Sequence, residues 1–290
     1  MKLSTATYPL SKTFGDERAI EILAEAGFDA IDYTMCVMKD DDFCPLNSEG
    51  YRAYAESLKK IVQKHNLTVN QAHAPFPGYR FGEEEYNARL FSRIVRSMEI
   101  ASILGAPHII VHPIACPHGV DTLKFNLDMY SRFLPYCKEY NIKIAVENMF
   151  GWNAKRDVII KNVCSDAGDL AQMVDALDSQ WFGACLDTGH VAIIGEEPQD
   201  SIRILGRERI IALHIHDNNY RGDYHLLPYE GKLEWLEILK ALGEIGYDGD
   251  FTYEADGFLE GFDEPFAFEA AKFMHELGRK MISYIESAKM

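Results

Sequence analysis

The chain of 290 residues has few cysteines and no pattern that would pair them. Its six cysteines form no Cys-x-x-Cys pair and no closely spaced framework. A disulfide-stabilised scaffold is therefore excluded. The first residues, Met1 to Thr5, do not resemble a secretory signal peptide. Together these absences predict reduced thiols and a cytoplasmic protein.

Long apolar runs and an excess of basic residues are also missing. No apolar stretch reaches the roughly 18 residues that a membrane span needs, so we expect no membrane association. Acidic residues outnumber basic ones by 45 to 29, which gives a formal net charge of −16. Such a surface repels polyanions, so nucleic acid is not expected as the main partner. No glycine-rich phosphate loop is present, and Lys155 and Arg156 are the only weak candidates for a phosphate clamp.

Short apolar segments alternate with amphipathic ones along the whole chain, without a low-complexity linker. We predict strands at 3–8, 30–33, 68–72, 108–111, 143–146, 182–186, 210–213 and 251–253. Helices are predicted between them, among others at 16–26, 48–65, 84–104, 121–140, 198–205, 233–245 and 266–287, with loops at 36–46 and around 151–156. Eight such units favour an α/β fold with one (β/α)8 TIM barrel domain over residues 1–290. An open, doubly wound sheet is the alternative.

Six consecutive predicted strands end in a side chain that can bind a metal. In a barrel these ends meet at the C-terminal face. A single Glu after a strand is usually a helix cap or a surface group, and a single His in an apolar strand is usually a hydrogen-bonded core residue. Repetition at six strand ends is what indicates a site. The residues are His73, His112, Glu147, Asp187, His214 and Glu254.

Four of these residues, Glu147, Asp187, His214 and Glu254, form an oxygen-rich set with one nitrogen. Such a set suits Mn²⁺, Zn²⁺, Mg²⁺ or Co²⁺. Three carboxylates crowded together without a cation would repel one another and take up protons. We therefore predict a divalent metal site, with one ion expected.

A second group of ligand-type residues follows the last strands. His190 lies three residues after Asp187, and Asp223 and His225 lie beyond His214. They could bind additional metal, up to three ions in total with His73 and His112, or contact substrate, or support the first ligands. His216 is interpreted as a hydrogen-bonded wall residue.

Four segments of the sequence resemble the xylose-isomerase-like TIM barrel superfamily. They are Val-Glu-Asn at 146–148, Leu-Asp-Thr-Gly-His at 186–190, Leu-His-Ile-His-Asp-Asn at 213–218 and Gly-Tyr-Asp-Gly…Tyr-Glu-Ala at 246–255. The superfamily contains sugar and sugar-phosphate isomerases and epimerases, inosose dehydratases, hydroxypyruvate isomerases and the endonuclease IV family. The resemblance covers nearly the whole chain but does not choose among these activities.

The resemblance implies roles for individual residues. In ketose 3-epimerases the positions matching Glu147, Asp187, His214 and Glu254 bind one divalent metal, and the two glutamates exchange the substrate proton. His190 and Arg221 would contact substrate hydroxyls. The endonucleases use the same four positions together with those matching His73, His112, His190, Asp223 and His225 to hold three zinc ions, and all nine residues are present here.

We therefore expect a metal-dependent isomerase or epimerase of a sugar, a sugar phosphate or a polyol, which moves a proton through an enediolate. Glu147 and Glu254 are the predicted catalytic residues, and Phe76, Tyr79 and Trp152 are expected to pack against the sugar. The alternatives are a zinc phosphodiesterase acting on abasic DNA, a related keto-polyol dehydratase and a metal-binding relative without catalysis. A homo-oligomer is expected from similar barrels.

Overall fold

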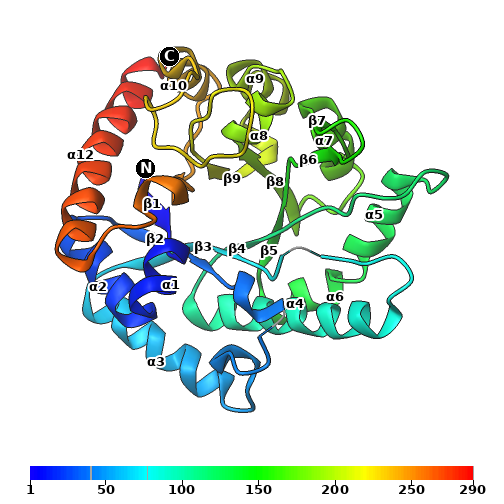
Figure 1. Ribbon diagram of the computed structural model, residues 1–290, viewed down its shortest axis with the longest axis horizontal. Helices are drawn as coiled ribbons and strands as arrows, with labels where there is room; N and C mark the ends of the chain where they lie inside the picture. Colours follow the sequence, from blue (N-terminus) through cyan, green and yellow to red (C-terminus); the bar gives the residue numbers. More distant parts are fainter. Residues whose placement is uncertain (40, 77, 290) are drawn as a thin grey trace.

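A computed structural model describes residues 1–39, 41–76 and 78–289 of the chain. Asp40, in the predicted loop at 36–46, and Pro77, after the third predicted strand, lie outside this description. The described residues form a ring of parallel strands surrounded by helices (Figure 1).

Eight parallel strands form the barrel in the order β10-β1-β2-β3-β4-β5-β8-β9. Backbone bonds from Ile215 N to Thr252 O and from Glu254 N to Ile215 O join the two ends of this order, which makes the barrel nearly closed. The predicted TIM barrel is therefore confirmed, and the open-sheet alternative is wrong. The strands are β1 (Leu3–Ala6), β2 (Ala30–Thr34), β3 (Thr68–His73), β4 (His108–Val111), β5 (Lys143–Glu147), β8 (Phe182–Asp187), β9 (Ile210–His214) and β10 (Phe251–Tyr253).

The outer helices begin and end where the sequence provides caps. Asp121 and Asp166 accept backbone bonds at the first turns of α5 and α7, which satisfy otherwise unpaired N–H groups. Gly27 and Gly105 end α2 and α4 with positive φ. The longer helices are α2 (Asp16–Ala26), α3 (Tyr51–Lys64), α4 (Glu84–Leu104), α5 (Thr122–Ser131), α7 (Ala167–Asp175), α9 (Pro198–Arg209), α10 (Trp235–Glu244) and α12 (Glu264–Ala288).

Three predicted segments differ from the structure. The first strand stops at Ala6, and α1 (Tyr8–Phe14) follows it with a proline in its first turn. The predicted helix at 121–140 is divided into α5 and α6 (Leu134–Tyr140), because Pro135 has no N–H to continue the helix. The predicted loop around 151–156 contains a hairpin of β6 (Phe150–Asn153) and β7 (Val158–Lys161).

Short elements at the strand ends complete the open face of the barrel. They are α8 (Thr188–Ile193), α11 (Asp256–Leu259) and two 3-10 helices, η1 (Cys36–Lys39) and η2 (Pro45–Asn47). Among the described residues, no helix has the length and apolar composition to cross a membrane.

The barrel interior is divided into an apolar and a polar half. Ile110, Ala145, Cys185 and Ala212 form a small buried cluster between β4, β5, β8 and β9. The opposite side carries buried polar side chains from β10, β1, β2 and β3, namely Ser4, Asp32, Asn70, Gln71 and Thr252. Buried polar groups must find hydrogen-bond partners, so this half depends on specific contacts.

Candidate metal centre and active site

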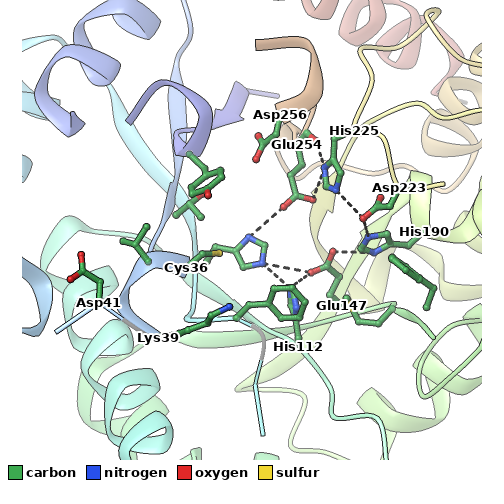
Figure 2. A pocket seen from close by; sticks show the side chains of 17 residues that line it. Cys36, Lys39, Asp41, His112, Glu147, His190, Asp223, His225, Glu254 and Asp256 are labelled. Carbon is green, nitrogen blue, oxygen red and sulfur yellow. Dashed lines mark hydrogen bonds and ion pairs between the residues drawn. The ribbon is translucent and has the colours of Figure 1, made fainter. Parts of the chain in front are cut away.

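A cavity of about 850 Å³ opens at the C-terminal ends of the strands (Figure 2). Seven of the nine predicted site residues line it: His73, His112, Glu147, His190, Asp223, His225 and Glu254. The other two, Asp187 and His214, are fully buried behind this surface. The barrel thus brings all nine predicted residues to one end, as parallel strands require.

The four core residues converge on one imidazole nitrogen. The Nδ1 atom of His214 lies 3.0 Å from Glu147 Oε1, 3.3 Å from Glu254 Oε2 and 3.9 Å from Asp187 Oδ2. One ligand atom from each of these residues lies within 4.8 Å of the others, and all four side chains are buried. Three carboxylates and one imidazole in this arrangement fit a hard or borderline divalent cation.

The two glutamates have pKa values that move in opposite directions. Burial raises the pKa of Glu254 well above its usual range, and the nearby imidazoles of His214 and His225 do not offset this. Burial also acts on Glu147, but His214 and His112 outweigh it and hold the pKa of Glu147 well below its usual range. Such a divergence separates an acid from a base in one site.

A second group of ligand atoms lies beside the core set. His112 Nε2 is 2.7 Å from Glu147 Oε2 and 2.7 Å from His73 Nε2. His73, His112 and Glu147 therefore form a trio of ligand-type residues that shares Glu147 with the core set. Two imidazoles and a carboxylate suit zinc among the divalent cations.

A third group contains one residue that the sequence interpretation placed only in the wall. Asp223 Oδ2 lies 3.2 Å from His225 Nε2 and 3.5 Å from His190 Nε2. His216 joins them with its Nε2 atom 3.9 Å from Asp223 Oδ1. His216 is also hydrogen-bonded as expected, because the same nitrogen lies 2.9 Å from Asp187 Oδ1. Alternation along the strand, which turns His216 to the side of His214, is the sequence signal for this position.

Two buried polar side chains join neighbouring strand ends. Asn148 donates to the backbone oxygen of Asp187 at 3.0 Å and accepts from the backbone nitrogen of Asp187 at 2.7 Å. The backbone oxygen of Asn148 lies 2.9 Å from His190 Nδ1. Thr188 Oγ1 donates to the backbone oxygen of His216 at 2.9 Å. Asn148 and Thr188 therefore hold the ligand-type side chains of β5, β8 and β9 in register.

The residues predicted to touch substrate are placed unequally. Phe76 and His190 line the cavity. The ring centroids of Phe76 and His112 are 4.1 Å apart. Trp152 is 55% exposed on β6, Arg221 is exposed, and neither is among the residues that line the cavity. Tyr79 lines a separate, smaller cavity of about 230 Å³ instead.

Several lining residues were not predicted from the sequence. Phe150, which directly precedes the predicted loop at 151–156, lines the cavity, and its ring centroid lies 5.1 Å from that of His190. Asp256 lies two residues beyond Glu254, and burial raises its pKa to about 6. Cys36 and Lys39 lie in η1, and Asp41 follows it, in the segment after β2. Their position after a strand is the one signal that could have placed them at this face.

Comparison with known sequences places the chain in one family. A family model described as a xylose isomerase-like TIM barrel matches residues 20–277. A protein of Sinorhizobium fredii described as uncharacterised is 31% identical over 169 residues, which are 54% of this chain and 50% of that protein. The chain therefore spans about half the length of that relative.

Two relatives carry descriptions of an activity. A D-psicose 3-epimerase of Enterocloster bolteae is 37% identical over 95 residues, 33% of this chain and 29% of that enzyme. An inosose dehydratase of Bacillus thuringiensis is 30% identical over 102 residues, 35% of this chain and 30% of that enzyme.

Solved structures share the fold at lower sequence identity. A D-tagatose 3-epimerase-like protein superposes with a TM-score of 0.76 at 23% identity, and the match covers 99% of both chains. The IOLI protein, solved with a zinc atom bound, has a TM-score of 0.75 at 18% identity over 99% of this chain and 100% of that one. The barrel, its ligand-bearing strand ends and the match over residues 20–277 lead to one conclusion: the chain belongs to the xylose isomerase-like TIM barrel family.

Proposed function

We propose that this protein is a metal-dependent epimerase or isomerase of a small ketose or related polyol. The observation that carries this proposal is the pair of glutamates, Glu147 and Glu254. Both line the cavity, and both approach the same nitrogen of His214, at 3.0 and 3.3 Å. Two carboxylates that face one cavity at the end of a barrel suit the removal and return of a carbon-bound proton.

The residues that would hold the metal are Glu147, Asp187, His214 and Glu254. Their donor set fits Mn²⁺, Zn²⁺, Mg²⁺ or Co²⁺, with one ion expected and the two neighbouring groups allowing up to three. A bound divalent cation would polarise the substrate carbonyl and stabilise an enediolate by several kcal/mol.

The side chains of this protein would carry the proton. One glutamate removes the proton next to the carbonyl, and the same or the other glutamate returns it. Return to the opposite face inverts the carbon, whereas return to the adjacent carbon moves the carbonyl. His190, held by the Asn148 backbone oxygen and by Asp223, would bind a substrate hydroxyl. Phe76 and Phe150 would pack against the C–H face of the sugar.

The named epimerase among the relatives supports this reaction class, and the named inosose dehydratase supports a keto-polyol dehydratase as the nearest alternative. Both reactions begin with removal of a proton beside a carbonyl. They differ in whether a hydroxyl leaves afterwards. The oligomeric state and the cytoplasmic location stay predictions.

The second candidate from another class is a zinc phosphodiesterase acting on abasic DNA. The three groups of ligand-type residues around one cavity favour it. The net charge of −16 opposes it, because a DNA-binding surface must neutralise phosphates. Cleavage of an abasic duplex that weakens with increasing salt would favour this candidate over the epimerase.

Solvent-deuterium exchange tests the proposal. Metal-loaded protein is incubated in D₂O with D-fructose, D-psicose or D-tagatose, and deuterium in the sugar is measured by mass spectrometry. We expect exchange by the wild type and a loss of about 10²–10⁴-fold for Glu147→Gln and Glu254→Gln. Glu237→Gln, at an exposed position on α10, is the matched control and should retain the wild-type rate. Retained exchange in both cavity variants would rule out the assigned roles.

A further inference from the structure

Asp32 is a fully buried carboxylate on β2, one of the two strands beside β1 and far along the chain from the predicted ligands. It does not line the cavity. Its Oδ2 atom forms an ion pair with Nε2 of His214 at 3.5 Å, and this nitrogen is buried without a closer hydrogen-bond partner. Gln71 Nε2 donates to the same oxygen of Asp32 at 2.9 Å. A buried charge is costly unless other groups satisfy it, so its position behind a ligand requires an explanation.

The two nitrogens of His214 face different surroundings. Nδ1 faces the three carboxylates of the core set, whereas Nε2 faces Asp32. An imidazole binds a metal through a nitrogen without a proton, and the other nitrogen then carries the proton. A carboxylate at Nε2 is the partner that keeps the proton there and leaves Nδ1 free.

We propose that Asp32 is a positioning residue that fixes the ring orientation and tautomer of His214 for metal binding through Nδ1. This inference rests on the proposed metal-dependent function. It adds to that function a carboxylate–histidine–metal arrangement that extends the site into the barrel interior.

Asp32 is itself held by a chain of buried side chains across the polar half of the barrel. Gln71 Nε2 donates to Asp32, and Gln71 Oε1 accepts from Thr252 Oγ1 at 3.3 Å. Asn70 Nδ2 donates to Thr252 Oγ1 at 2.9 Å, and Ser4 Oγ donates to Asn70 Oδ1 at 2.6 Å. These bonds link β1, β2, β3 and β10, so the carboxylate is fixed by the strands and not by a mobile loop.

Direct metal binding by Asp32 is the alternative role for the same residues, and it requires an additional deprotonation. Asp32, His73 and His214 could form a ligand trio. Such an ion would use Nε2 of His214 while the core set uses Nδ1, so both nitrogens of one ring would have to lose their protons. The positioning role needs no such deprotonation, because Nε2 keeps its proton facing the Asp32 carboxylate.

The metal affinity of Asp32 variants tests whether this carboxylate supports metal binding by His214. Metal-free protein is titrated with Zn²⁺ or Mn²⁺ against a chelator, without a sugar substrate. Asp32→Asn keeps an acceptor beside His214 but loses the charge, and Asp32→Ala loses both. We expect a graded loss, reaching about 10–100-fold for Asp32→Ala. Asp200→Asn, which removes an exposed carboxylate in the first turn of α9 outside the buried chain, is the matched control and should bind as tightly as the wild type.

A measurement on the wild type does not depend on the variants folding. In zinc-loaded protein with ¹⁵N-labelled histidine, the His214 ring should carry a slowly exchanging proton on Nε2. A His214 ring protonated on Nδ1, or wild-type affinity in Asp32→Ala, would overturn this inference alone. A wild type that binds no divalent metal would overturn the proposed function, and the positioning role with it.

Discussion

Buried ionisable side chains around the cavity differ in pKa because each has different neighbours. Burial, reinforced by the adjacent His112, lowers the pKa of His73 to about 3. His190 is equally buried, but the carboxylates of Asp187 and Asp223 outweigh burial and raise its pKa to about 10. One histidine is thus kept neutral and the other charged in the metal-free protein, which follows from the side of the cavity on which each lies.

His108 provides a pH-dependent test away from the cavity. It begins β4, its Nε2 atom is buried without a hydrogen-bond partner, and burial lowers its pKa to about 4. The unfolded chain takes up a proton near pH 6.5, but the folded protein does not until about pH 4. This histidine should therefore cost stability as the pH falls from about 6.5 to about 4, by up to about 3 kcal/mol.

The measurement is the free energy of unfolding of wild type and His108→Gln at several pH values. Other histidines titrate in the same range, so the difference between the two proteins isolates position 108. As the pH falls, we expect the free energy of unfolding of His108→Gln to rise relative to that of the wild type. A difference that stays constant from pH 7 to pH 4 would contradict the assigned burial effect.

Residues at the strand ends were predictable, whereas residues behind them were not. A His or a carboxylate directly after an apolar strand, as at His214 and Glu254, can be recognised because a parallel barrel sends all such positions to one face. Asp32 carries its carboxylate inside a predicted strand. Its partner His214 is more than 180 residues away along the chain, so only the folded barrel shows what it contacts.

The β6–β7 hairpin shows how an unpredicted element changes the choice of substrate residues. Trp152 was expected at the cavity because it follows β5. The antiparallel pairing of Phe150 with Lys161 and of Trp152 with Ile159 makes the segment a hairpin. Phe150, where the hairpin begins, lines the cavity, and Trp152 does not. No clear alternation marks this pairing in the sequence, because β6 contains Gly151 and Asn153.

Substitutions within this hairpin test that assignment. Phe150→Ala should raise the KM for the ketose about 10-fold, because it removes an aromatic surface worth about 1–1.5 kcal/mol next to His190. Trp152→Ala, on the same hairpin and exposed, is the matched control and should change KM little. Thermal unfolding checks that both variants fold. A larger increase in KM for Trp152→Ala than for Phe150→Ala would instead assign the substrate contact to Trp152.

At the scale of the whole molecule, closure of the barrel assembles residues from distant parts of the chain. The four residues of the core set come from β5, β8, β9 and the end of β10, and the bonds between Ile215 and β10 bring the last of these to the others. The fold was predictable because eight alternating units leave few topologies. The division of the interior into a polar and an apolar half was not, because it depends on which strands become neighbours.

Metal binding by the intact protein tests whether the residues at the strand ends form a metal site. Protein stripped with EDTA is reloaded with Mn²⁺, Co²⁺ or Zn²⁺, and the bound metal per chain is measured together with the unfolding temperature. We expect at least one tightly bound ion per chain and a stabilisation of about 2.7 kcal/mol at a free metal concentration 100 times the Kd. His214→Ala should abolish the tight ion, because His214 supplies the only nitrogen of the core set. A folded wild type that binds no divalent metal, with an unfolding temperature unmoved by any of the three ions, would show that these residues form no metal site.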